Sequence, residues 1–322
     1  MLTSLFRSLW QWGSFVKFSH TIFALPFALA STALAARQTS GWPGTRTFAL
    51  ILVAMVGGRT CAMAFNRIMD RRFDALNPRT AGRHLPAGAI SLTSAWLLCA
   101  LSATALVAAS WALNPLCFKL SPVALFLVCF YSLTKRFTDF TQVWLGLALA
   151  VAPVGAWLAV KGSLDFWPPN LAALQSTAHT PSWLAGSAYV PLSLAAAVML
   201  WLIGFDVIYA TQDYEFDRRQ GLRSLVTRWG LDNALAVAFL AHLFTWGWFV
   251  VVGVLSRFLL AYWIGLVLIL ALLLMEHLLA RRRTPEVVNI AFFKLNATIS
   301  LTYLVVVLCE ILFPWFRLRV YA

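Results

Sequence analysis

The chain has 322 residues, of which 61% are hydrophobic and only 11% are charged. A soluble domain has about 25% charged residues, so too few polar side chains remain here to cover a surface exposed to water. The formal net charge is +13, but the basic residues lie between apolar runs, where membrane topology alone predicts them. Composition therefore excludes a soluble protein, and without a nucleic-acid motif the charge does not indicate a nucleic-acid partner.

Continuous apolar runs predict the membrane-spanning elements, because a helix needs about 20 apolar residues to cross a bilayer. A barrel would instead show short alternating strands. We predict an all-α polytopic membrane protein with about nine transmembrane helices, forming a single domain over residues 1–322. The predicted spans cover residues 16–36, 48–69, 91–113, 116–133, 140–160, 186–209, 232–254, 258–280 and 293–315.

Lys and Arg residues gather in the loops on one side of this predicted bundle. They are concentrated at residues 70–90, 134–139, 210–231 and 281–292, and are fewer in the loops on the other side. Cytoplasmic loops are typically enriched in Lys and Arg. We therefore expect an integral protein of the inner (cytoplasmic) membrane, with the N-terminus in the cytoplasm and the C-terminus on the opposite side.

Half of the twelve acidic residues fall in two windows at the ends of the second and sixth spans. At 100° per residue, a spacing of four residues keeps side chains on one helical face. Carboxylates at this depth usually face the bundle interior and mark a functional site. The first face carries Asn66, Asp70 and Asp74; the second carries Asp206, Asp213 and Asp217, and Glu215 lies in the second window.

Like charges stacked on one helical face repel each other, so these windows require a counter-charge. Mg²⁺ prefers carboxylate oxygens and often bridges them to phosphates. We interpret Asn66, Asp70, Asp74, Asp213 and Asp217 as metal ligands; solvated loop ends with incidental ion pairs are the alternative. Neighbouring arginines are predicted to bind phosphate oxygens: Arg67, Arg71, Arg79, Arg83, Arg218, Arg219 and Arg223.

Three sequence elements together resemble the UbiA superfamily of intramembrane prenyltransferases. The first is Asn66-x-x-x-Asp70-x-x-x-Asp74 with the Asn-Pro-Arg-Thr loop after it, within residues 66–88. The second lies within residues 206–228 and includes Asp206, Tyr209, Asp213 and Asp217. The third is Tyr131-x-x-x-Lys135. Within the superfamily, the chain is most similar to the 4-hydroxybenzoate polyprenyltransferase branch and its menaquinone-pathway relatives.

The resemblance implies nine helices around a central cavity that opens sideways to lipid, with the two acidic motifs facing each other across its mouth. It implies Mg²⁺-dependent transfer of a polyprenyl group from its diphosphate to a ring carbon of an aromatic carboxylate. Quinone biosynthesis is the implied pathway, and no protein partner is indicated. The expected catalytic residues are Asp70, Asp74, Asp213, Asp217 and Lys135. The expected substrate-binding residues are Asn66, Arg79, Arg83, Tyr131, Tyr209, Asp206, Lys17 and His20.

Several alternatives remain open. The acceptor is 4-hydroxybenzoate or a dihydroxynaphthoate, and haem farnesylation is a third activity within the superfamily. A membrane transporter is the rival from another class, although it would favour isolated midplane charges and inverted repeats. Lys17 and His20 either anchor the first span at the interface or contact the acceptor's carboxylate. His242 and His277 have no partner at metal-ligand spacing, so a structural or interfacial role is predicted for both.

Overall fold

The computed structural model describes residues 10–17, 21–167, 182–281 and 291–313. Within these ranges, eight helices are long and apolar enough to cross a membrane, and a shorter apolar helix covers Phe23–Arg37. This confirms the predicted all-α membrane architecture. The α-helices are α2 (Thr21–Arg37), α3 (Thr45–Leu76), α4 (Leu92–Leu113), α5 (Pro115–Phe130), α6 (Thr141–Lys161), α7 (Tyr189–Ala210), α8 (Tyr214–Arg219), α9 (Leu225–Leu255), α10 (Leu260–Ala280) and α12 (Asn296–Leu312). Shorter 3-10 or π turns are η2 (Tyr131–Arg136), η4 (Ser182–Gly186), η5 (Thr211–Asp213) and η6 (Ala291–Leu295).

Two helices extend further than the apolar runs predicted. Helix α3 continues to Leu76, seven residues past the predicted end at 69, and α9 begins at Leu225 with a break at Gly230, where φ is 78°. Charged residues at these ends are unfavourable in the hydrocarbon core of a bilayer, but they are compatible with a helix. As a result, Asp70 and Asp74 lie on the helix itself, and the loop begins only at Asn77.

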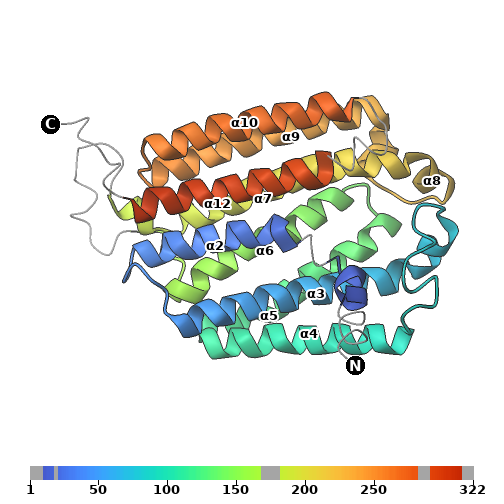
Figure 1. The fold of residues 1–322 in the computed structure, drawn as a ribbon, viewed down its shortest axis with the longest axis horizontal. Helices are drawn as coiled ribbons and strands as arrows, with labels where there is room; N and C mark the ends of the chain where they lie inside the picture. Colours follow the sequence, from blue (N-terminus) through green and yellow to red (C-terminus); the bar gives the residue numbers. More distant parts are fainter. Residues whose placement is uncertain (1–9, 18–20, 168–181, 282–290, 314–322) are drawn as a thin grey trace.

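The helices form one bundle that is closed by neighbours far apart in the sequence. Helix α7 packs against α6 and α9, α12 packs against α10 and α2, and α2 packs against α6. Helices α3, α4 and α5 pack against one another, and α3 and α5 also contact α6. Figure 1 shows α8 and the loop after α3 at the same end of the bundle. Elements from both halves of the chain therefore meet at that end.

Small residues allow the closest helix contacts, as is common where no hydrophobic effect drives helices together in lipid. A Cβ added at Gly57 of α3 would lie 2.9 Å from the Ser102 carbonyl oxygen of α4. A Cβ at Gly146 of α6 would lie 2.8 Å from the Met199 carbonyl oxygen of α7. A side chain at either position would push the two backbones apart.

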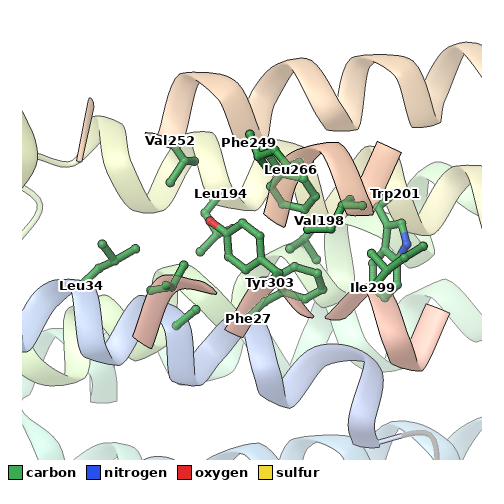
Figure 2. Packing of buried hydrophobic residues seen from close by; sticks show 14 of the residues in the cluster. Phe27, Leu34, Leu194, Val198, Trp201, Phe249, Val252, Leu266, Ile299 and Tyr303 are labelled. Carbon is green, nitrogen blue, oxygen red and sulfur yellow. The ribbon is translucent and has the colours of Figure 1, made fainter. Parts of the chain in front are cut away.

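A cluster of aromatic side chains forms the centre of the largest apolar core (Figure 2). Phe249 of α9 stacks on Tyr303 of α12 with ring centroids 4.5 Å apart, and Phe27 of α2 lies 5.1 Å from Trp201 of α7. All four side chains are fully buried. Such ring pairs stabilise packing beyond the area that they bury, so this cluster holds α2, α7, α9 and α12 together.

Candidate active site

A cavity of about 540 Å³ lies between α2, α3, η2, α6 and α7 and extends to η5 and α8. Most of its charged side chains come from the end of α3, the loop after it, η2, η5 and α8, and this part is called the charged end; apolar side chains such as Leu145, Leu149, Leu202 and Phe205 also line the cavity. Every residue that the family resemblance marks as catalytic or substrate-binding lines this cavity except His20, which falls outside the described residues. The roles given to these residues stay predictions; their convergence on one cavity is an observation.

The first acidic motif projects from one face of α3. The Asn66 amide donates a hydrogen bond of 2.9 Å to Asp70 Oδ2. One turn further on, Asp74 is buried, and its Oδ1 accepts a hydrogen bond of 2.5 Å from Arg83 in the following loop. The second oxygen, Oδ2, is buried and has no hydrogen-bond partner among the residues that the structure describes. A buried carboxylate oxygen without a partner is costly, which is consistent with a ligand-binding position.

The second acidic motif is divided among three short elements. Helix α7 ends at Ala210, η5 carries Asp213, and α8 carries Asp217. This break differs from a single continuous helical face. Nevertheless Asp206, Asp213 and Asp217 all line the cavity.

The loop after α3 connects the two motifs. The Asn77 amide donates to Asp213 Oδ1 at 3.0 Å, and Arg79 Nε donates to the same oxygen at 2.9 Å. A second Arg79 nitrogen donates to Asp213 Oδ2, and a third donates to the Tyr209 hydroxyl at 2.7 Å. Burial disfavours the charged guanidinium, but its hydrogen bonds to Asp213 outweigh this effect and raise the pKa of Arg79. The motifs thus face each other across the charged end of the cavity.

Lys135 reaches the same end from η2, the turn that follows α5. Its ammonium nitrogen lies 3.8 Å from Asp217 Oδ2. Its backbone carbonyl accepts a hydrogen bond of 2.8 Å from Arg223 N, which ties η2 to the segment after α8. Tyr131, at the start of η2, is buried against the cavity wall. The Tyr131-x-x-x-Lys135 element therefore completes a ring of charges with both acidic motifs.

Lys17 lies at the cationic side of this ring. It ends the short helix of residues 10–15, in a turn where its φ is 50°. Partial burial and the positive charges of Arg67, Arg83 and Arg79 lower the pKa of Lys17. Lys17 and these three arginines therefore form a group of four cations near the first motif, an arrangement that favours binding of an anion.

Sequence reasoning missed one deeply placed cation. Arg59 lies on α3 two turns before Asn66 and lines the cavity, and its buried Nε has no hydrogen-bond partner within the described part of the chain. Its position inside a predicted span was the available signal, because an intramembrane charge is a functional-site candidate by default. Asn77 was likewise not singled out as a partner of Asp213.

Four of the arginines predicted to hold phosphate lie outside the cavity lining: Arg71, Arg218, Arg219 and Arg223. Arg71 donates to its own helix at Ile68 O, and Arg223 donates to Phe137 O at 3.0 Å. Arg218 and Arg219 are exposed on α8. Their predicted role stays untested, but in this structure they do not line the cavity, because proximity in sequence to an acidic motif does not decide which way a side chain projects.

The carboxylates fit Mg²⁺ by their chemistry. No group of three or more His, Cys, Asp or Glu side chains in the described ranges is arranged to hold one ion by itself. Mg²⁺ needs only one or two protein carboxylates when substrate phosphates and water complete its coordination. The partnerless Oδ2 of Asp74 and the amide–carboxylate pair Asn66 and Asp70 are suitable donors.

Comparisons with known proteins agree with this architecture. The model of the UbiA prenyltransferase family matches residues 24–298. A 4-hydroxybenzoate octaprenyltransferase from Tolumonas auensis is 30% identical over 79% of this chain and 81% of its own, and one from Nitrosospira multiformis is 31% identical over 76% of each.

Among solved structures, a UbiA homologue from Aeropyrum pernix K1 matches with a TM-score of 0.72 at 28% identity, over 91% of this chain and 97% of its own. A UbiA homologue from Archaeoglobus fulgidus, bound to GPP and Mg²⁺, matches with a TM-score of 0.65 at 19% identity, over 92% and 99% of the two chains. The second likeness concerns the fold alone. With a family match over most of its length, this chain belongs to the UbiA prenyltransferase family.

Proposed function

We propose that this protein transfers a polyprenyl group from a polyprenyl diphosphate to a ring carbon of an aromatic carboxylate, with Mg²⁺ bound at the two acidic motifs. The observation that carries the proposal is one cavity with two carboxylate motifs and several cations at one end and apolar walls beyond them. The relatives named 4-hydroxybenzoate octaprenyltransferase support it. So does the UbiA homologue bound to GPP and Mg²⁺.

Asn66, Asp70 and Asp74 would hold one metal ion, and Asp213 and Asp217 the other. Bound Mg²⁺ would neutralise the charge that develops on the leaving diphosphate. Arg83 and Arg79 donate hydrogen bonds to Asp74 and Asp213. These guanidinium groups keep the carboxylates compensated, and each would turn to a phosphate oxygen when substrate enters.

Arg79, Arg83 and Lys135 would bind the diphosphate and stabilise its charge as the bond to the allylic carbon breaks. The walls formed by Leu145, Leu202 and other apolar side chains would exclude water from the allylic cation. Phe23 and Phe205 also line the cavity, and aromatic faces attract a cation. The protein residues would thus bind the leaving group at one end and shield the reactive carbon at the other.

The acceptor would sit deeper, with its carboxylate near Arg59. A buried guanidinium with an unpartnered Nε is costly until an anion binds it. Lys17 is a second candidate for this carboxylate, and His20 lies outside the described residues. Asp206, which lines the cavity, or the released diphosphate would take the proton that the ring carbon loses.

The charged end of the cavity would face the cytoplasm, where Mg²⁺ and both charged substrate groups are available. This orientation follows from the distribution of Lys and Arg, and it corresponds to an N-terminus inside the cell. A transporter is less consistent with the site, because most charged residues that line the cavity belong to the two acidic motifs and the segments beside them, whereas transporters favour isolated midplane charges.

The test uses purified protein in liposomes with a labelled polyprenyl diphosphate, Mg²⁺, and one acceptor at a time. The acceptors are 4-hydroxybenzoate, a dihydroxynaphthoate and haem, and mass spectrometry identifies the prenylated product. We expect product with an aromatic carboxylate and none when EDTA removes the metal. Product from haem alone would replace the proposed acceptor class, and ion flux without any product would support the transporter.

A further inference from the structure

A second buried polar cluster lies behind the wall of the cavity, among α7, α9, α10 and α12. It consists of His242, Glu276, His277 and Asn296. His242 Nδ1 lies 2.9 Å from His277 Nε2 and 3.9 Å from Glu276 Oε2, and the Asn296 amide donates to Glu276 Oε1 at 2.8 Å. Ionisable groups buried in membrane-spanning helices are costly and usually functional, yet none of these four residues lines the cavity.

The hydrogen bonds determine which way the His242 ring points. Its Nε2 lies 3.1 Å from the Trp201 carbonyl oxygen of α7. A carbonyl can only accept, so Nε2 carries the proton. Nδ1 of the neutral ring is then an acceptor, and His277 Nε2 donates to it. The chain of donors thus runs from α10 through α9 to α7 and ends on the backbone.

The ring of His242 also lies directly against α7. A Cβ added at Gly204 would lie 2.2 Å from His242 Cδ2 and 2.3 Å from Nε2. On the same helix, Leu202, Phe205 and Asp206 line the cavity. Gly204 projects about 160° away from Asp206 at 100° per residue. Helix α7 is therefore a single-helix wall, with the cavity on one face and His242 on the other.

We propose that His242, held in place by His277 and the Glu276–Asn296 pair, is a positioning residue that sets how far α7 projects into the cavity. Its hydrogen bond to the Trp201 carbonyl keeps α7 from moving toward the cavity. Its ring, which fits only beside Gly204, keeps α7 from moving closer to α9. Asp206 and Phe205 are positioned as a result. The inference rests on the proposed prenyl transfer, in which these two side chains face the acceptor and the allylic carbon.

Steady-state kinetics of the purified protein in liposomes test the proposal, with product formation measured per folded protein. We expect His242→Leu to lower kcat by about 10- to 100-fold, because misplacement of reacting groups by about 1 Å has an effect of this size. The KM for the polyprenyl diphosphate should change less than twofold, because the phosphate-binding side chains come from η2 and the loop after α3. His242→Gln, which can still donate from its Nε2, should recover part of the rate.

Three further variants separate positioning from stability. Thr245→Val is the matched control: Thr245 is buried one turn away on α9, and its hydroxyl donates to Ala241 O of its own helix, so the kcat of this variant should be unchanged. Gly204→Ala should lower kcat, and combination with His242→Ala should restore part of it by removing the ring that the new methyl meets. This pair remains informative if His242→Leu does not fold.

A normal kcat in folded His242→Leu would overturn the proposal. A fall in total product formation that only reflects a smaller amount of folded protein, with kcat per folded molecule unchanged, would also overturn it. A wild-type protein that transfers no prenyl group would instead refute the proposed function, and it is measured in the same series.

Discussion

The two acidic motifs provide similar ligands by different backbone routes. The first lies on α3, an unbroken helix of 32 residues. The second is spread over the end of α7, the turn η5 and the short helix α8. A continuous helix fixes the spacing of Asp70 and Asp74, whereas the broken segment lets Asp213 project toward the loop after α3. The first motif is therefore positioned by one helix, and the second by the contacts of Asp213 with the loop after α3.

The largest effects should come from removing one carboxylate on each side. Asp70→Ala and Asp213→Ala should each reduce prenyl transfer by on the order of 10³-fold, the scale of losing charge stabilisation in a closed site. Glu215→Ala is the matched control, because Glu215 is exposed on α8. Product formation in liposomes is the measurement, with circular dichroism to verify folding. Full transfer by both variants would exclude the metal site at these motifs.

The next effect concerns the link between the motifs. Arg79→Lys keeps the charge but loses the fork that contacts both Asp213 oxygens and Tyr209. Because lysine cannot bind bidentately, we expect kcat/KM for the diphosphate to fall by about tenfold to 100-fold. Arg72→Lys, an exposed position on α3, should have no effect. Equal losses in the two variants would show that the link has no special role.

A smaller and more selective effect is expected deeper in the cavity. Arg59→Gln should raise the KM for a carboxylated acceptor by about tenfold, because the bidentate charge-assisted contact is lost. The KM for the diphosphate should stay the same. An acceptor that lacks the carboxylate should be used equally well by both proteins. If the variant impaired both acceptors alike, Arg59 would instead be required to shape the cavity.

The smallest effect is a pH dependence of the acceptor KM that arises from Lys17. Burial and the neighbouring arginines lower the pKa of Lys17, so its positive charge is present at low pH and is lost, as pH rises, earlier than for an ordinary lysine. If Lys17 contacts the acceptor, the acceptor KM should rise severalfold on the alkaline side. In Lys17→Arg this rise should disappear, because arginine stays charged. An unchanged pH profile would leave Lys17 as an anchor at the interface.

The sequence was sufficient where one helix carries the information. Asn66, Asp70 and Asp74 follow from helical spacing alone. Hydropathy predicts nine spans, and the described part of the chain has eight helices long enough to cross a membrane and one shorter apolar helix. The pairing of Asn77 with Asp213 joins residues 136 positions apart, and local periodicity carries no information about it. The same limit explains His242 and His277: each lacks a partner in its own helix, and only the packing of α9 on α10 brings the two rings together.

The length of α3 has a consequence for the lipid around the protein. At 1.5 Å per residue its 32 residues extend about 48 Å, while the hydrocarbon core is about 30 Å thick. With the predicted apolar run from residue 48 onward in the hydrocarbon core, the surplus would lie in the last turns and would place Asn66, Asp70 and Asp74 at the level of the headgroups. In a thicker bilayer, the Asp70 and Asp74 carboxylates would be drawn toward the hydrocarbon, or α3 would have to tilt less from the bilayer normal. Hydrophobic mismatch could thereby make the rate of catalysis depend on the acyl-chain length of the membrane.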